Sequence, residues 1–132
     1  MHIDIAELVR ESLRASGCQE SYLNEFDGHS TIALEFDNCP NILISLNDEK
    51  VVIWSQLAEH SPNTIFQNAG SILELVMTPV EFSVTGQYQI KEMDGYTVLH
   101  CTCRDDCLSP EIFSDVLEKF YLNLFRYSEV IR

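Results

Sequence analysis

The sequence predicts an α+β fold in which three helices cover an antiparallel five-stranded sheet, in the order helix, three strands, helix, two strands, helix. Three observations support this prediction: consecutive β-rich runs fill residues 30–58, an alternating hairpin pattern spans residues 82–103, and three stretches carry apolar residues at helical spacing. The 132 residues are expected to form one domain, 1–132, which can bury a core without a disulfide or metal.

The first helix is predicted to begin after Asp4, because Asp4 and Glu7 form a capping-box pattern. Its apolar stripe consists of Ile5, Leu8, Val9 and Leu13. It is expected to end near residues 16–17, and the polar stretch 18–29 leads into the sheet.

Three β-rich runs, at residues 30–37, 41–46 and 50–57, are predicted to form a meander. Apolar and polar residues alternate in the first run, which is typical of a strand with one buried face. The third run is apolar on both faces, so we expect it inside the sheet. Its Trp54 is expected in the core or an interface.

A second helix is predicted from the cap Ser61 to about Thr78, where Pro79 stops it. It carries two apolar rows, Ile65, Ala69, Ile72 and Val76, and Phe66, Gly70, Leu73 and Met77. A sheet covers only one side of this helix, so the second row is predicted to meet another subunit. Periodicity leaves one wide core-facing stripe as an equal alternative.

Residues 82–90 and 96–103 alternate in polarity around Asp94 and Gly95, which predicts a hairpin. A cap followed by proline, Ser109 and Pro110, then opens the last helix. Large apolar residues recur along that helix to Ile131, so we expect it to be deeply packed.

The charge balance limits the partners. With 21 acidic and 8 basic side chains, the formal net charge is −13 at pH 7. Nucleic acid is therefore a poor partner, and basic or neutral proteins are better ones. The alternative is an acidic surface that only maintains solubility. The chain has no apolar run of membrane-spanning length and no signal-peptide pattern at its start, which predicts a cytoplasmic protein without membrane insertion.

The one cluster with metal-ligand chemistry comprises His100, Cys101, Cys103 and Cys107. Alternation on a strand places His100 opposite the first two cysteines, so neither a shared metal site nor a cofactor is expected. Two neighbouring aspartates should raise the pKa of Cys107, which argues against a reactive nucleophile. The sequence shows no nucleophile–base spacing and no phosphate-binding glycine loop, so an enzyme is disfavoured.

Four stretches of the sequence, at residues 4–18, 27–32, 40–46 and 51–57, resemble the InvB-type chaperones of type III secretion systems, also called surface-presentation-of-antigens chaperones. The resemblance covers nearly the whole chain and is densest before residue 60. It implies a small, acidic, cytoplasmic bacterial homodimer without catalysis or cofactor. Such a chaperone binds the N-terminal segments of several secreted effectors and keeps them soluble and secretion-competent.

The resemblance also implies two surfaces. The dimer surface would lie on the second helix, at Ile72, Leu73 and Val76. The groove for an extended effector segment would involve Ile5, Val9, Leu13, Ile32, Leu34 and Leu43, unless these residues form the core. In such families the effector segment often adds a strand to a sheet edge. The alternatives are an acidic adaptor for a folded basic partner, and a metal or thiol protein acting through its cysteines.

Overall fold

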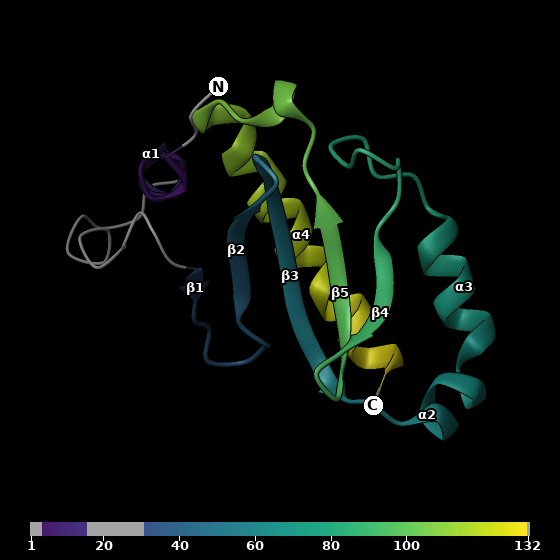
Figure 1. Cartoon of the computed structure of the whole chain (residues 1–132). Helices are drawn as coiled ribbons and strands as arrows, with labels where there is room; N and C mark the ends of the chain where they lie inside the picture. The colour runs from purple at the N-terminus through teal and green to yellow at the C-terminus, as the bar shows by residue number, and fades with distance from the viewer. Residues whose placement is uncertain (1–3, 16–30, 132) are drawn as a thin grey trace.

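The computed structural model describes residues 4–15 and 31–131, and an antiparallel sheet in the order β1-β2-β3-β5-β4 lies at its centre (Figure 1). Its elements are α1 (Ile5–Ala15), β1 (Ile32–Leu34), β2 (Ile42–Asn47), β3 (Lys50–Glu59), α2 (Pro62–Gln67), α3 (Ala69–Met77), β4 (Gln89–Met93), β5 (Tyr96–Thr102), a 3₁₀ turn (Asp105–Cys107) and α4 (Pro110–Val130). The predicted α+β class and the antiparallel five-stranded sheet are confirmed.

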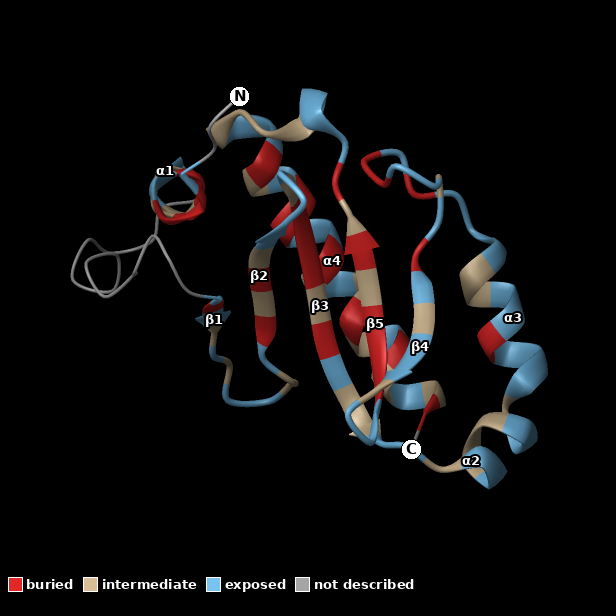
Figure 2. Ribbon diagram, in the orientation of Figure 1, coloured by how far each residue is buried: buried red, intermediate tan, exposed pale blue. Residues whose placement is uncertain are grey.

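The core lies between α4 and one face of the sheet, with α1 beside the β1 edge and α2 and α3 beyond β4 (Figures 1 and 2). The helix contributes Phe113, Phe120 and Tyr127, which are fully buried against strand residues such as Ile53 and Leu99. Each such side chain contributes about 1.5–3 kcal/mol through burial. The last helix is therefore deeply packed, as predicted.

Local signals that were visible in the sequence form the expected structures at several places. The carboxylate of Asp4 accepts a hydrogen bond from the Glu7 amide at 3.1 Å, so Asp4 caps α1. Ser61 Oγ accepts a hydrogen bond from the Thr64 amide at the start of α2. The central position predicted for the third strand is also confirmed. The predicted end of the first helix and the stretch 18–29 lie outside the described residues.

The predicted boundaries of the first strand and of the second helix were wrong. The first strand comprises only Ile32–Leu34, not the whole run to residue 37. The helix predicted from Ser61 is two helices, because Asn68 leaves helical geometry with φ −112° and ψ 15°. Asn68 Nδ2 donates to the Thr64 carbonyl at 2.9 Å, a local bond of the kind that competes with helix continuation.

The first half of the predicted hairpin is largely a loop, with the strand starting only at Gln89. Ser83 Oγ donates to the Gln87 carbonyl at 2.8 Å, and the Val80 amide donates to the Gly86 carbonyl at 2.8 Å. These bonds satisfy the backbone within the loop in place of a ladder. An isolated bridge, Ser83 to Cys103, keeps this loop attached to the end of β5.

Candidate functional surfaces

The six residues predicted for the effector groove fall into three different environments. Ile5, Val9 and Ile32 are buried at 3%, 0% and 3% exposure and belong to the core. Leu13 of α1 and Leu34 of β1 are half-buried and pack against this core. Leu43 lies on the opposite face of the sheet from the core-facing Ile42 and Ile44. The structure therefore brings five of the six together and separates Leu43 from them.

Strand β1 is an edge of the described sheet, and its register shows which backbone groups point outward. Asp48 and Glu49 have φ of 52° and 65°, so a two-residue turn joins β2 to β3 and makes Asn47 and Lys50 a hydrogen-bonded pair. Bonded and non-bonded pairs alternate from there. In β2, Ile42 and Ile44 therefore form their backbone hydrogen bonds with β1. Ala33 and Leu43 face each other as a pair without hydrogen bonds between them. The N–H and C=O of the exposed Ala33 therefore point away from β2, toward the edge of the described sheet.

One face of the sheet is turned away from α4 (Figure 1), and its centre is formed by Leu43, Val52, Trp54 and Val98. Trp54 is half-buried there, paired with Leu43 on one side and His100 on the other. Val52 and Val98 are buried on the same face. Burial, together with the charge of Lys91, lowers the pKa of His100 to about 4, and its Nδ1 has no hydrogen-bond partner among the described residues. His100 is thus neutral in the folded protein at neutral pH.

This neutral histidine predicts a loss of stability in mild acid. Because the folded pKa of His100 lies below its ordinary 6.5, only the unfolded chain takes up a proton as the pH falls from about 6.5 toward about 4. We expect His100→Gln to reduce the fall in unfolding free energy between about pH 7 and about pH 5 by about 1–2 kcal/mol. Urea unfolding of both proteins at the two pH values measures this. Equal falls in the two proteins would contradict a lowered pKa.

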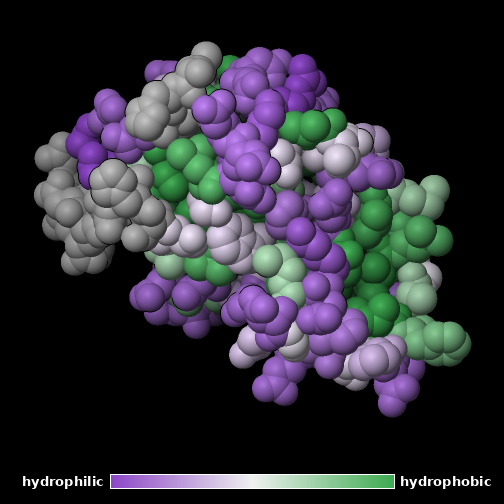
Figure 3. All heavy atoms as spheres, viewed as in Figure 1, coloured by the Kyte–Doolittle hydropathy of each residue, from purple (hydrophilic) through white to green (hydrophobic). Residues whose placement is uncertain are grey.

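An exposed apolar row runs along α2 and α3, where Figure 3 shows green side chains gathered on the right of the molecule. Phe66, Leu73 and Met77 are 84%, 59% and 63% exposed, and among the described residues no atom beyond its own helix backbone and chain neighbours lies within 4 Å of where a Cβ on Gly70 would be. We call these three side chains the α2–α3 row. Of the residues predicted for the interface, Leu73 belongs to this row. Ile72 is 8% exposed and part of the subunit's own core, and Val76 packs half-buried against that core.

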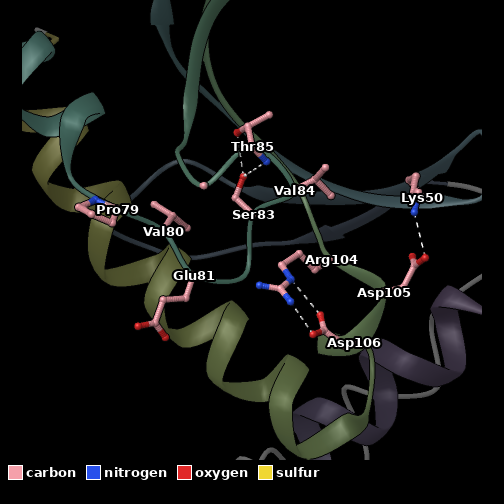
Figure 4. Close-up of a pocket in the computed structure, with 11 residues that line it drawn as sticks. Lys50, Pro79, Val80, Glu81, Ser83, Val84, Thr85, Arg104, Asp105 and Asp106 are labelled. Atoms are coloured by element: carbon pink, nitrogen blue, oxygen red, sulfur yellow. Dashed lines mark hydrogen bonds and ion pairs between the residues drawn. The ribbon is translucent and has the colours of Figure 1, made fainter.

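A wide, open depression of about 800 Å³ lies at the end of the sheet near the β2–β3 turn (Figure 4). Its two basic side chains are both paired: Lys50 Nζ is 2.9 Å from Asp105, and Arg104 makes two hydrogen bonds to Asp106. Glu81 adds a further negative charge. These lining residues have no uncompensated positive charge to bind a phosphate or a carboxylate.

The cysteine cluster divides as the strand alternation predicted. Cys101 and Cys103 are buried in the core, while His100 lies on the other face. Contact with Cys101, together with burial, raises the pKa of Cys103, and burial and the neighbouring Asp106 raise the pKa of Cys107. Among residues 4–15 and 31–131, no three His, Cys, Asp or Glu side chains are placed to hold a metal ion.

None of the described helices is long and apolar enough to cross a membrane. In comparisons with known proteins, the Invasion protein B family matches residues 17–94. The surface presentation of antigens proteins SpaK of Salmonella typhimurium (strain LT2) and of Salmonella typhi are each 41% identical to this chain over 121 residues. These 121 residues are 91% of this chain and 90% of each relative.

A solved structure has the same fold. It is a chain in the heterodimeric ExoU-SpcU complex from the type III secretion system of Pseudomonas aeruginosa, which superposes with a TM-score of 0.61 over 94% of this chain and 98% of that chain. At 16% identity, this likeness speaks to the fold. The family match and the SpaK relatives extend over most of the chain and include β1, β2 and β3. The chain therefore belongs to the Invasion protein B family, the InvB- and SpaK-type chaperones of type III secretion.

Proposed function

We propose that this protein is a single-domain cytoplasmic chaperone that binds the N-terminal segments of several secreted effectors and keeps them non-globular for export. The observation that carries the proposal is β1 at the edge of the described sheet, where the N–H and C=O of Ala33 point outward next to the half-buried Leu34. An extended segment can pair with such an edge through its backbone while its alternate side chains contact the apolar margin. In the ExoU-SpcU structure the protein of similar fold is likewise part of a heterodimeric complex.

This arrangement suits a chaperone with several clients. Backbone pairing depends little on client sequence, so an edge strand accepts different segments, and the apolar contacts select among them. The buried residues Ile5, Val9 and Ile32 hold α1 and β1 in place rather than contacting the client themselves. A client bound in extended form hides its aggregation-prone side chains and needs no unfolding before export.

We also propose that the chaperone is a homodimer and that its interface is the α2–α3 row. Three large apolar side chains that are each more than half exposed, on two consecutive helices, are unusual for a monomer surface. Gly70, at the start of α3 between Phe66 and Leu73 in the sequence, allows a partner to approach the backbone closely. The interface thus keeps the predicted Leu73, while Phe66 and Met77 take the places of Ile72 and Val76.

The chaperone function is tested by a pull-down of the tagged protein from its native cytoplasm, followed by limited proteolysis and mass spectrometry. We expect protected N-terminal segments of more than one secreted protein. Binding through backbone pairing and apolar contacts should persist at about 0.5 M salt, whereas a folded basic partner held by charge should be released. Recovery of only a salt-sensitive folded partner would favour the acidic adaptor.

A further inference from the structure

The residues that follow β1 continue its alternation of inward and outward side chains. Leu34 packs against the core, and Phe36 stacks on a tyrosine of α4 with ring centroids 4.8 Å apart. Between and after them, Glu35 and Asp37 are exposed, as Ala33 is. The exposed side chains therefore lie on the sheet face turned away from α4, which we call the outer face.

The carboxylates of Glu35 and Asp37 have no counter-charge close to them on the outer face. All charged side chains of residues 31–49, which include β1 and β2, are acidic, and no described basic residue forms an ion pair with either carboxylate. The strands place two lysines on this face. Lys50 lies 2.9 Å from a carboxylate of the 3₁₀ turn, and Lys91 of β4 is four strand spacings from β1, roughly 19 Å. Salt screens charges at that separation.

Helix α1 lies beside the β1 edge and carries two arginines, but it packs against α4 and so belongs to the inner side of the sheet (Figure 1). Arg14 also forms an ion pair with Glu11 of the same helix. The two sides of the β1 edge therefore differ: the inner side offers apolar contacts, and the outer face carries unpaired negative charge.

A client strand paired with β1 would present its alternate side chains to these two surroundings. The client residue opposite Ala33 would lie on the outer face, with the two Cβ atoms about 4.5–5.5 Å apart and diagonal neighbours about 7–8 Å apart. Because Ala33 is small, a long side chain in that position has room to extend along the strand to the carboxylate of Glu35. Opposite charges in such pairs stabilise the pairing, and like charges directly opposite each other destabilise it.

We propose that the β1 edge selects effector segments with a basic outer face, which carry lysine or arginine at the position opposite Ala33 and at the next position on the same face, where these side chains contact Glu35 and Asp37. This inference rests on the proposed chaperone function and adds a chemical requirement to it. The backbone of β1 accepts any extended segment, whereas the two carboxylates discriminate by charge. Since exposed ion pairs are weak, they adjust client affinity, and binding as a whole persists at high salt.

Three fluorescein-labelled peptides, TVKVKVT, TVQVQVT and TVEVEVT, test this selection, because they share one apolar face and differ only in the charge of the other. Fluorescence anisotropy measures their affinities. At low salt we expect the lysine peptide to bind about 10–30-fold more tightly than the glutamate peptide, with the glutamine peptide between them. At about 0.5 M salt the ratio should fall below about threefold, because exposed charge pairs are screened. Equal affinities at low salt would overturn the proposal.

Matched variants are needed because the net charge of −13 attracts any basic peptide. With Glu35→Lys and Asp37→Lys combined, the order should reverse, so that the glutamate peptide binds about 3–10-fold more tightly than the lysine peptide. Glu59→Lys with Glu81→Lys changes the net charge equally at two exposed carboxylates outside β1 and β2, and the lysine peptide should remain the tighter ligand. Equal changes in the two double variants would show attraction by the whole surface and exclude the proposed selection.

Ala33→Pro separates a failure of this selection from a failure of the chaperone function. We expect the lysine peptide to lose most of its affinity for Ala33→Pro and to keep it for Ala33→Thr. If Ala33→Pro alone weakens binding and the Glu35→Lys, Asp37→Lys protein binds like the original, clients pair with β1 and the charge selection is wrong. If Ala33→Pro binds the lysine peptide as tightly as the original protein does, or if no peptide binds at about 1 mM, the observation that carries the chaperone function is lost, and the selection fails with it.

Discussion

Leu73→Asp is expected to convert the proposed homodimer into folded monomers. Leu73 is 59% exposed in a single subunit, so an aspartate there remains solvated in the monomer and costs little stability. In the dimer the same aspartate would be buried without a partner, once from each subunit across a two-fold axis. An unpaired charge in a buried contact costs several kcal/mol, so we expect the dissociation constant to rise at least about 100-fold.

Light scattering coupled to gel filtration measures this, together with circular dichroism to confirm folding. Leu122→Asp is the matched control, because Leu122 of α4 is 57% exposed and lies outside the α2–α3 row. It should leave the dimer intact. Ile72→Asp is the informative contrast, since Ile72 is in the core and its replacement should unfold the subunit itself. A Leu73→Asp protein that retains the dimer mass would exclude the α2–α3 row as the interface.

The sequence predicted the fold well where local chemistry and tertiary packing agree. Asp4 caps α1, and Asp94 and Gly95 both adopt positive φ in the β4–β5 turn. The continuous apolar run containing Ile53 is a central strand, as its burial requires. In each case the sequence pattern spans only a few residues, and the residues that predict the element are the ones that form it.

Prediction failed where side chains satisfy the backbone in ways that periodicity does not show. Asn68 interrupts an apolar pattern that continues unchanged on both sides of it. Ser83 bonds the Gln87 carbonyl, so an alternating sequence forms a loop rather than a strand. One or two hydrogen bonds decide the backbone conformation at these positions, and the spacing of apolar residues does not predict those bonds.

The candidate site was harder to predict than the fold for a related reason. Apolar spacing marks a helix face, but it does not say whether that face meets the subunit's own core or another molecule. Ile72 and Leu73 are neighbours with similar side chains, yet one is 8% and the other 59% exposed. That difference depends on which side of α3 packs against α4 and the rest of the core, which only the tertiary structure provides.

Ala33→Pro is expected to abolish most client binding while leaving the free protein folded. The Ala33 amide points away from β2, so proline removes no hydrogen bond of the β1–β2 ladder, and edge strands accept proline at such positions. A client strand paired with this edge loses the donor, keeps an unsatisfied carbonyl and meets the proline ring. Together these effects should weaken client affinity about 10–100-fold. Ala33→Thr retains the amide and is the matched control, for which binding should be unchanged.

Fluorescence anisotropy of an effector segment recovered in the pull-down measures both affinities, and the melting temperature checks folding. The comparison separates two ways of holding an extended client. If Ala33→Pro binds as tightly as Ala33→Thr, the client does not pair with β1 and is held by apolar contacts alone. In that case Leu34→Asp should still reduce binding, because Leu34 lies half-buried at the margin beside the same edge. Loss of binding in Ala33→Pro alone shows that the edge backbone supplies affinity, which explains how one small chaperone can accept clients with little sequence in common.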